Sequence, residues 1–401
     1  THDIENTIYA DYIYIMQEGE IYFSGSPREV FTKPDKILSA GLELPQHLLI
    51  YYLFRSHFDL EALEQVKAKF AKGIFTPEET ARALYLMSQY DMVEYPKHKH
   101  NEKILVQTSR LKEEKALIRV EDLSFSYQKD TSLELKALDD ISFAINQGEL
   151  IAVTGHSGSG KSTLISHLNG LIRPQAGEVS VMGLNTADKK QIRKIRQHLG
   201  LLFQYPEHQL FENTVYDDIA FGPKQFGVEG QQLEKNIKQA IEIVNLDQEI
   251  LSRSPFELSG GQQRRVAIAG VIAMDCDIYV LDEPAAGLDP IGKREILDYI
   301  VELKKLGKTV ILVTHDMTLV AEIADRVMVL NQGRLVGFDS VEKIFSNSNL
   351  LKKAGLKEPA AYDFARILSK QFNKNILGFT VEQVKANLLT SLTKSEGKLN
   401  E

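Results

Sequence analysis

The hydrophobic residues of the chain fall into short continuous runs separated by polar and glycine-rich segments, as in α/β proteins. The run from Leu150 to Val153 predicts a buried strand, and 163–168 after it predicts a helix. A second run, Ile278 to Leu281, is typical of a central parallel strand that is buried on both faces. A third, "TVILVT", ends just before His315. The pattern therefore predicts a sheet of buried strands that are followed by polar residues.

Matching residues recur in two distant parts of the chain. The pairs that align at one constant spacing include Asp11 with Asp325, Gly19 with Gly333, Ser26 with Ser340 and Phe31 with Phe345. After a shift of register, "FTPEETARAL" from Phe75 resembles "FTVEQVKANL" from Phe379. Internal similarity of this kind indicates a duplicated unit.

The repeat divides the chain into four parts. We interpret residues 1–90 as the C-terminal tail of a first unit, whose head we expect to precede Thr1. Residues 91–115 are polar, charged and without a sustained period, which predicts a linker. Residues 116–345 form the body of a complete second unit, and residues 346–401 its C-terminal extension. The alternative is a tail that was duplicated on its own.

Composition limits the class of protein. The chain has 401 residues, 43% hydrophobic and 25% charged, which is ordinary for a globular protein. Its longest uninterrupted apolar run, Leu48 to Phe54, is far shorter than the ~18 residues of a spanning helix. Cys276 is the only cysteine, so no disulfide forms within the chain. The net charge of −8 argues against a dedicated nucleic-acid binder.

A phosphate-binding loop lies between the first predicted strand and its helix. The segment fits the pattern G-x-x-x-x-G-K-[ST], in which glycines let backbone N–H groups turn toward phosphates. The start of the next helix adds its positive end. Lys161 is expected to reach the β- and γ-phosphates, and the Ser162 hydroxyl to bind Mg²⁺. The residues expected around the nucleotide are Gly155, His156, Ser157, Gly158, Ser159, Gly160, Lys161, Ser162 and Thr163.

Two carboxylates follow the second apolar run directly. Ligands of open α/β sheets bind beyond the carboxyl ends of the strands, which is where Asp282 and Glu283 emerge. Beside a phosphate loop, Asp282 is expected to hold Mg²⁺, and Glu283 to take a proton from the water that attacks the γ-phosphate. Cys276, just before this strand, is interpreted as a small apolar filler.

A second glycine-lined helix start, "LSGGQ", opens an apolar-periodic segment and is also suited to phosphate. Its residues are Leu258, Ser259, Gly260, Gly261 and Gln262. This string resembles the signature motif of ATP-binding cassette (ABC) ATPases, in which two cassettes close head to tail and each signature completes the site of the other. Arg264 and Arg265, which follow it, are expected to form a solvated helix face without a catalytic role.

The other motifs of that family follow in its order between Leu117 and about Phe345. The resemblance implies that Tyr127 stacks on adenine and that Gln204 senses Mg²⁺ and the γ-phosphate. It also implies a D-loop and a switch histidine, His315, that contacts the γ-phosphate. The D-loop residues are Gly287, Leu288 and Asp289. Thr1-His2-Asp3 resembles the switch segment of a first cassette.

The stretch from Phe203 to Gly227 narrows the resemblance. It leads from Gln204 into an acidic helix with Asn213 and Thr214 as capping candidates, and it is similar to the ATPases of energy-coupling factor (ECF) transporters. Those proteins import vitamins and cobalt or nickel. Ala285 departs from the pattern, since the family usually has Thr there; no role named here depends on that hydroxyl.

The resemblance implies an ABC-type P-loop fold: a mixed sheet, an antiparallel β subdomain, a helical signature subdomain and an α-rich C-terminal extension used for pairing. It implies ATP hydrolysis with Mg²⁺ at the cytoplasmic side of the cell membrane. The expected partners are a second cassette, a transmembrane coupling subunit and a small membrane protein that binds the transported substrate, whose identity this chain does not encode.

Three other functions stay open at this point. A cassette of a conventional importer or exporter would differ only in its membrane partner. A tandem ABC ATPase acting on ribosomes or DNA tends to carry basic linkers, zinc-binding cysteine pairs or coiled-coil insertions, which are absent from this sequence. An inactive regulatory cassette would lack the equivalents of Glu283 or Ser259, and both are present.

Overall fold

The computed structural model describes residues 4–17, 19–90, 92 and 116–393. Almost all of the predicted linker, 91–115, lies outside the described residues, and so does the predicted switch segment Thr1-His2-Asp3.

The chain folds as two compact units, and each is considered by itself. Unit 1 consists of Thr1–Val106, Asp289–Ile291 and Glu358–Glu401, and unit 2 of Gln107–Leu288 and Gly292–Lys357. Unit 2 contains every motif of the second copy except the end of the D-loop, and unit 1 brings together segments from both ends of the sequence.

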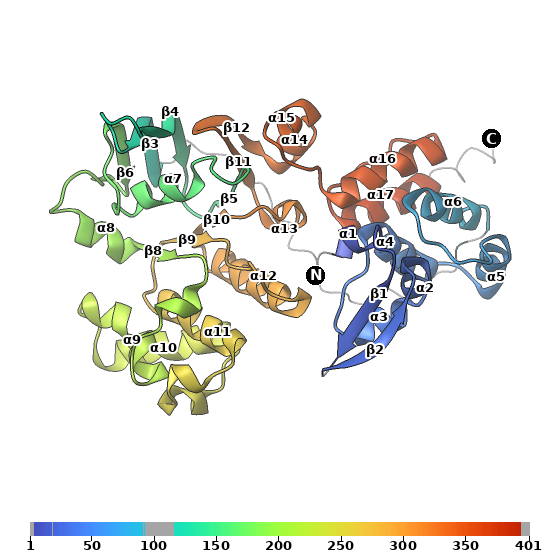
Figure 1. Ribbon diagram of the computed structural model, residues 1–401, viewed down its shortest axis with the longest axis horizontal. Coiled ribbons are helices and arrows are strands. Elements are labelled where there is room, and N and C mark those ends of the chain that lie inside the picture. The colour runs from blue at the N-terminus through green and yellow to red at the C-terminus, as the bar shows by residue number, and fades with distance from the viewer. Residues whose placement is uncertain (1–3, 18, 91, 93–115, 394–401) are drawn as a thin grey trace. The chain divides into compact units, whose positions relative to one another are not determined.

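A six-stranded sheet forms the middle of unit 2 (Figure 1). Its strands are β5 (Leu150–Thr154), β8 (Leu199–Leu202), β9 (Ile278–Asp282), β10 (Thr309–Val313), β11 (Arg326–Asn331) and β12 (Arg334–Ser340). They lie in the order β12-β11-β5-β10-β9-β8, and all neighbours are parallel except β11 and β12. Side chains alternate between two cores: Ile278 and Val280 face one, whereas Tyr279 and Leu281 face the other.

Two further layers complete the cassette. The antiparallel sheet consists of β3 (Ile118–Tyr127), β4 (Leu135–Ile145), β6 (Ala176–Val181) and β7 (Leu184–Asn185). The helical part contains η1 (Pro206–Gln209), α9 (Val215–Gln225), α10 (Gly230–Ile243), η2 (Gln248–Ser252), η3 (Pro255–Glu257) and α11 (Gly260–Ile272). The remaining helices of the second copy, up to the tail, are α7 (Lys161–Leu168), α8 (Ile192–His198), α12 (Pro290–Lys305), α13 (Met317–Ile323), α14 (Val341–Phe345) and α15 (Ser348–Lys353).

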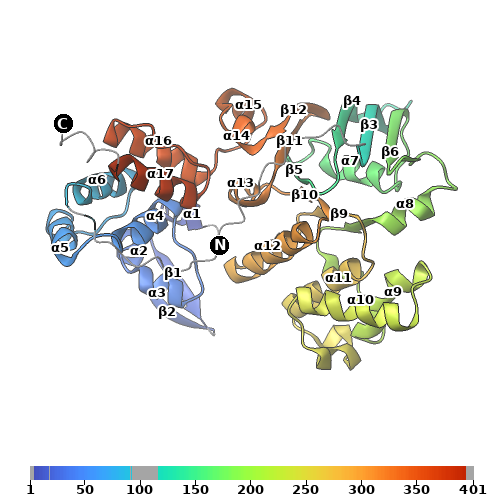
Figure 2. The same ribbon diagram turned by 180° about the vertical axis from the view of Figure 1, so that it is seen from behind.

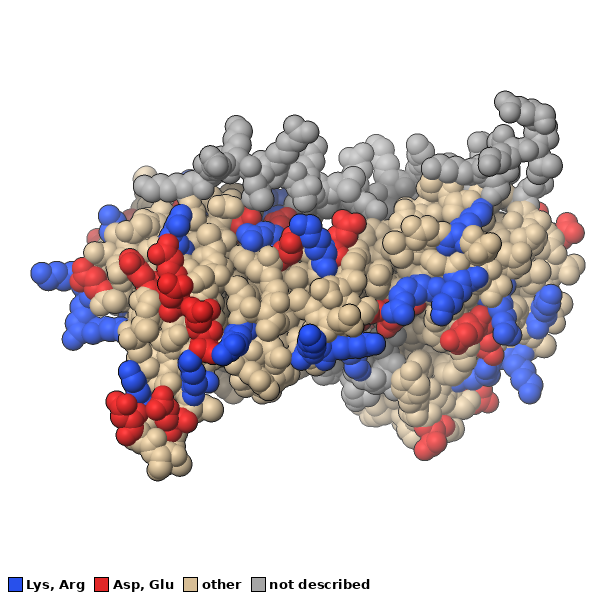
Figure 3. Space-filling view, turned by 90° about the horizontal axis from the view of Figure 1, so that it is seen from above, with Lys and Arg blue, Asp and Glu red and all other residues tan. Residues whose placement is uncertain are grey.

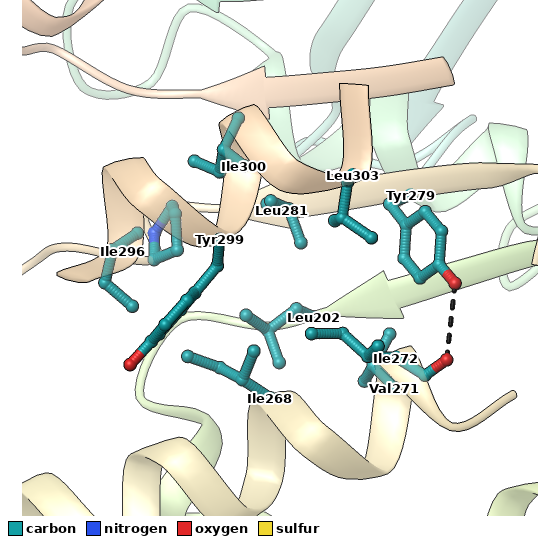
Figure 4. A pocket seen from close by; sticks show the side chains of 11 residues that line it. Leu202, Ile268, Val271, Ile272, Tyr279, Leu281, Ile296, Tyr299, Ile300 and Leu303 are labelled. Carbon is teal, nitrogen blue, oxygen red and sulfur yellow. Dashed lines mark hydrogen bonds between the residues drawn. The ribbon is translucent and has the colours of Figure 1, made fainter. Parts of the chain in front are cut away.

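Packing between α11, α12 and the strands β8 and β9 leaves a small cavity of about 20 Å³ (Figure 4). Leu202 and Leu281 enter it from the sheet, and Ile268 and Ile300 from the helices. The hydroxyl of Tyr279 donates to the Ile272 carbonyl at 3.4 Å. Because its lining is apolar, such a cavity stays dry, and α11 contacts the sheet here mainly through apolar side chains, with the Tyr279 hydrogen bond beside them.

Unit 1 begins with a hairpin that repeats a hairpin of unit 2. β1 (Ile13–Gln17) and β2 (Glu20–Gly25) pair antiparallel, with a register shift between Ile15 and Met16. β11 and β12 pair in the same register, with their shift at the aligned residues Val329 and Leu330. The short helix α1 (Ile4–Thr7) precedes the hairpin, and the helices α2 (Pro27–Phe31), α3 (Pro34–Ser39) and α5 (Leu60–Lys69) come after it. The sequence repeat is therefore also a structural repeat.

A four-helix core holds the rest of unit 1 together. It consists of α4 (Gln46–Arg55), α6 (Pro77–Met87), α16 (Ala360–Phe372) and α17 (Val381–Thr393), which lie side by side in both ribbon views (Figures 1 and 2). Phe54 and Leu84 share one apolar cluster with Phe364 and Leu388. The tail of the first copy thus packs on the tail of the second.

The helices α6 and α17 begin in the same way. The Phe75 N–H donates to the Glu79 carboxylate at 2.9 Å, and the Phe379 N–H donates to the Gln383 side-chain oxygen at 2.8 Å. Thr76 accepts from the Glu79 N–H as the N-cap of α6, and Thr380 accepts from the Gln383 N–H. The matched sequences "FTPEE" and "FTVEQ" therefore direct equivalent helix starts.

Candidate functional site

The predicted phosphate loop joins β5 to α7, as its sequence indicates. Gly155 and Gly160 have φ angles of 152° and 103°, which residues other than glycine rarely adopt. A Cβ at Gly155 would lie 2.3 Å from the Leu330 carbonyl oxygen, and one at Gly160 would lie 2.6 Å from that of Ala137. Both glycines are therefore required by the backbone conformation and by close backbone neighbours.

Lys161 opens α7 and turns its side chain back over the loop. Its Nζ donates to the carbonyls of Gly155 at 2.7 Å and His156 at 3.0 Å. Partial burial lowers the pKa of Lys161, and the nearby carboxylates Glu283 and Asp282 oppose that change. The ammonium is thus held at the loop, where it faces the space that the loop surrounds.

Ser162 and Asp282 meet from two different elements. The Ser162 hydroxyl, in the first turn of α7, donates to Asp282 Oδ2 at 3.3 Å at the end of β9. Burial raises the pKa of Asp282, and the charge of Glu283 raises it further, while Ser162 and Lys161 lower it. A carboxylate and a hydroxyl at this separation are oxygen donors of the kind that Mg²⁺ prefers.

Glu283 and His315 form the second pair at the carboxyl ends of the strands. His315 Nδ1 lies 2.9 Å from Glu283 Oε1, and this hydrogen bond is the main cause that raises the pKa of His315. Glu283 has a φ of 49° and donates its backbone N–H to Val313. A residue other than glycine or asparagine is strained in the left-handed conformation, and such residues are concentrated at functional sites.

Tyr127 ends β3 at the rim of the same region. Its hydroxyl lies 3.2 Å from the Thr163 hydroxyl, and its ring meets Phe125 edge to face. With 41% of its surface exposed, the ring has one side available to a planar ligand.

These side chains line one cleft of about 760 Å³. The predicted residues that line it are Tyr127, Gly155, His156, Ser157, Gly158, Gly160, Lys161, Ser162, Thr163, Gln204, Asp282, Glu283 and His315. Ser159 is fully buried in the loop instead. Lys136 and 355–357 line the cleft as well and were not predicted. No motif marks Lys136, and only the internal repeat drew attention to "AGLKEP", which contains Lys357.

The signature loop stands apart from this cleft. Ser259 caps α11, and its hydroxyl accepts from the Gln262 N–H in a capping box. A Cβ added at Gly260 or Gly261 would meet no atom within 4 Å. None of the described residues that line the cleft comes from 258–262.

The predicted D-loop also contributes nothing to the lining among the described residues. Gly287 has a φ of 74° and open space where a Cβ would lie. Leu288 packs at the edge of a core cluster, and Asp289 belongs to unit 1.

The expectation for Arg264 was wrong. Its side chain is 5% exposed and is not on a solvated face, because the turn after Gln204 packs on this side of α11. Arg264 donates to the Ala286 carbonyl at 2.9 Å and lies 3.4 Å from Glu207. Arg265 is also mostly covered, with 24% of its side chain exposed, and pairs with Glu295. Both partners are distant in sequence, so no local pattern indicated them.

Other expectations agree with the structure. Cys276 is buried, and burial raises its pKa to about 12, as for an inert apolar filler. Thr214 caps α9 by accepting from the Asp217 N–H.

Comparison with known proteins identifies the family. The family pattern described as ABC transporter matches residues 138–286. The Energy-coupling factor transporter ATP-binding protein EcfA2 of Caldanaerobacter subterraneus is 45% identical over 280 residues, which are 69% of this chain and 97% of that protein. The protein of the same name from Clostridium perfringens is 47% identical over 276 residues, 68% of this chain and 97% of that protein. The chain belongs to this family of ABC transporter ATPases.

Solved structures agree with the assignment. The cbiO1 protein of Clostridium perfringens, described as part of the ABC transporter complex cbiONQ, is 35% identical with a TM-score of 0.53; the match covers 61% of this chain and 97% of that one. The cassette MJ0796, solved as a dimer in a post-hydrolysis state with ADP and Pi, is 27% identical with a TM-score of 0.51, covering 56% and 98%. The predicted fold class, and the function as an ATP-hydrolysing subunit of the energy-coupling factor type, are confirmed at the level of the family.

Proposed function

We propose that this chain hydrolyses MgATP in the cleft between β3, the phosphate loop and the carboxyl ends of β9 and β10, and that turnover drives import through membrane partners. One observation carries the proposal: groups from separate parts of the sequence meet there with the chemistry that phosphoryl transfer needs. The loop and Lys161 bind phosphate, Ser162 and Asp282 offer oxygen ligands, and Glu283 offers a base.

ATP would lie with its adenine against Tyr127 and its phosphates in the loop. Lys161 exchanges its two carbonyl contacts for β- and γ-phosphate oxygens, to which its charge is better suited. When bound with the nucleotide, Mg²⁺ would supply positive charge that offsets the charge on the phosphates. Ser162 and Asp282 would hold the ion, and Gln204, which lines the same cleft, would be a further ligand.

Glu283 would orient the attacking water and accept its proton. The water oxygen bonds to the γ-phosphorus in line with the leaving ADP, the bond from that phosphorus to ADP breaks, and the proton passes to the Glu283 carboxylate. His315 holds Glu283 through Nδ1 at 2.9 Å and stands where its ring can contact the γ-phosphate. The strained backbone at Glu283 fixes the direction of the carboxylate.

A second cassette would complete the site. Ser259, Gly260 and Gly261 form a helix start that is exposed and lined by backbone N–H groups, yet belongs to no described wall of the cleft. The D-loop at 287–289 would lie at the same junction. Two cassettes that close head to tail would put each signature loop on the nucleotide of the other, consistent with the dimeric state of the MJ0796 cassette.

We further propose that residues 1–90 are the C-terminal part of a first cassette, joined by a linker at 91–115 to the cassette of 116–345 and its extension. The hairpin β1–β2 supports this, because it repeats the register and the bulge of β11–β12. The four-helix core of unit 1, made from both tails, supports a role of 346–401 in pairing. The native gene upstream of Thr1 tests the idea: a region that encodes no phosphate loop would overturn it.

The transmembrane coupling subunit is proposed to bind near Gln204. Phe211 is 58% exposed and Phe221 40% exposed, and their rings meet edge to face at 4.9 Å beside α9. Exposed aromatic pairs are typical of protein interfaces. Within the described residues, no helix combines the length and apolarity that crossing a bilayer requires. We propose a peripheral position on the cytoplasmic face, together with a small membrane subunit that selects the substrate.

The charge distribution argues against the nucleic-acid alternative. On the face that Figure 3 shows, Lys and Arg side chains lie interspersed with Asp and Glu side chains, and no broad basic surface is seen there. Together with the net charge of −8, this disfavours binding to a phosphate backbone.

Glu283→Gln in the intact transporter, purified in detergent, tests the proposed mechanism. The variant should bind ATP normally and hydrolyse it about 10³-fold more slowly, because the base is lost and the shape is kept. Glu302→Gln, an exposed position on α12, is the matched control and should turn over normally. Hydrolysis at the normal rate by Glu283→Gln would refute the role of Glu283. Co-purified ribosomes, DNA or a conventional permease would refute the proposed partners.

A further inference from the structure

Arg264 is a buried cation in the second turn of α11, and no role described so far uses it. Its Nη1 donates to the Ala286 carbonyl at 2.9 Å, and its Nε lies 3.4 Å from Glu207 Oε2. Nε, Nη2 and the Glu207 oxygen are buried and make no hydrogen bond. A buried ion pair with unused donors adds little to stability, so stability alone does not explain its presence.

Glu207 connects Arg264 to the turn that carries Gln204. It lies three positions after Gln204 in η1, and the backbone between them is constrained at two points: Tyr205 has a φ of 57°, and Pro206 is buried. A short, constrained segment transmits displacement rather than absorbing it. A movement of Gln204 at the nucleotide therefore displaces the Glu207 carboxylate against Arg264.

Ala286 connects Arg264 to the segment that carries Glu283. The Ala286 N–H donates to the Glu283 carbonyl at 3.0 Å, while its own carbonyl accepts from Arg264. The backbone of one residue, Ala286, thus links the Glu283 carbonyl to the guanidinium. Gly287, the first residue of the D-loop, comes next. Arg264 itself lies five positions after Ser259, on the same helix that presents the signature loop.

We propose that Arg264 is a positioning residue that couples the Gln204 turn and the Glu283 segment of one nucleotide site to the signature loop that serves the other. The inference rests on the proposed roles of Gln204, Glu283 and Ser259. The guanidinium is suited to this role because its planar fork contacts two segments at once. A change at the γ-phosphate then alters the direction in which α11 presents Ser259.

A purely structural role makes a different prediction, and two variants separate the roles. Arg264→Met leaves the mostly covered Glu207 carboxylate unpaired, which destabilises the cassette in either case. Replacing both residues, as Glu207→Met with Arg264→Met, removes both charges and should restore most of the stability, since apolar pairs of similar volume often replace buried ion pairs well.

The measurement is made on the intact transporter, with kcat, the ATP dissociation constant and the melting temperature of each variant. Arg264→Met should lower kcat about tenfold and leave the ATP dissociation constant within about twofold. The double variant should melt close to the wild type and keep the low kcat. Arg264→Lys, which retains the charge but has no fork, should fold and have an intermediate kcat.

A matched control exists elsewhere in the cassette. Arg326 also pairs with one glutamate, Glu149 at 3.4 Å, and one carbonyl, that of Ala144 at 3.3 Å. Neither Arg326 nor Glu149 belongs to a motif named above. Arg326→Met should lower the melting temperature and leave kcat within about twofold of the wild type.

Recovery of kcat together with stability in the double variant would overturn the proposal, and so would a kcat of Arg264→Met or Arg264→Lys equal to that of the wild type. Failure of the proposed function would give a different result: Glu283→Gln would then hydrolyse ATP normally, whatever the kcat of the Arg264 variants.

Discussion

The hairpins β1–β2 and β11–β12 share their strand register and bulge but have different surroundings. β11 pairs with β12 on one side and β5 on the other, and Met328 at its centre is 1% exposed. β1 pairs only with β2 within the described residues, and Tyr14, which aligns with Met328, is 62% exposed. The comparison teaches that local sequence is sufficient for the hairpin and its bulge, whereas burial of the face that carries Met328 requires other elements that pack on it.

The tails of the two copies differ less than the hairpins. Their helices share one core, and Phe54 of α4 and the aligned Leu368 of α16 are both 0% exposed. The helices of each tail therefore cover apolar side chains of the other tail. In the first copy the tail packs into that shared core, and, within the described residues, the edge of β1 that matches the β5-paired edge of β11 has no strand beside it.

The largest expected effect is on nucleotide binding, which should depend on the second copy and not on the first. Lys161→Ala should weaken ATP binding by about 100-fold or more, because the phosphate loop at 155–162 is the one such loop in the residues that the structure describes. Fluorescent-nucleotide titration of this chain measures it. Lys72→Ala, an exposed lysine of the first copy, is the control. Strong residual binding would mean that the first copy also holds nucleotide.

A smaller effect compares aligned hairpin positions. Met328→Ala should lower the free energy of unfolding by about 2–5 kcal/mol, since it leaves a cavity in a packed core. Tyr14→Ala should change it by less than about 1 kcal/mol, since the ring is exposed. Chemical denaturation of the purified chain measures both. Equal losses would show that β1 is covered in solution.

The two equivalent helix starts should have equal, modest effects. Thr76→Ala and Thr380→Ala each remove an acceptor for an N-terminal N–H and should cost about 1 kcal/mol. Because α6 and α17 share one core, both substitutions should destabilise the same unfolding transition. Denaturation followed by circular dichroism tests this. Loss at one threonine without loss at the other would contradict the equivalence of the two tails.

The smallest effect is a pH dependence of the second copy. The hydrogen bond to Glu283 raises the pKa of His315 above its ordinary value of 6.5. The stability that it contributes is present in full below the unfolded pKa and is lost as pH rises through the folded pKa. The exposure of His315 keeps this contribution small. Titration of the His315 ring by NMR should show a lower pKa in Glu283→Gln; an unchanged value would contradict the hydrogen bond.

Much of the fold and of the nucleotide cleft could be predicted from sequence because those features depend on neighbours in the chain. The glycines of the phosphate loop adopt conformations that their own residue type permits. The apolar run of β9 indicated a strand with two covered faces, and the structure confirms it. Asp282 and Glu283 follow that strand directly, so their place at the sheet edge followed from topology.

The environment of Arg264 and of β1 could not be predicted in this way. Arg264 lies next to Gln263 and Arg265 in a polar stretch, which indicates an exposed face, and its burial depends on Glu207 and Ala286. Likewise, the aromatic residues of β1 indicate a strand but not whether another strand covers it. Burial depends on which segments come together, and that is a property of the whole fold.

By itself the sequence determined the loop conformation, the order of strands and helices along the chain, the duplicated hairpin and the matched helix starts. These follow from backbone preferences and from hydrogen bonds between residues a few positions apart. The tertiary structure alone decided that both tails build one core, that Arg264 is inside, and that Tyr14 of β1 is exposed while Met328 of β11 is covered. These depend on desolvation by segments far apart in the chain, whose contributions no local pattern contains.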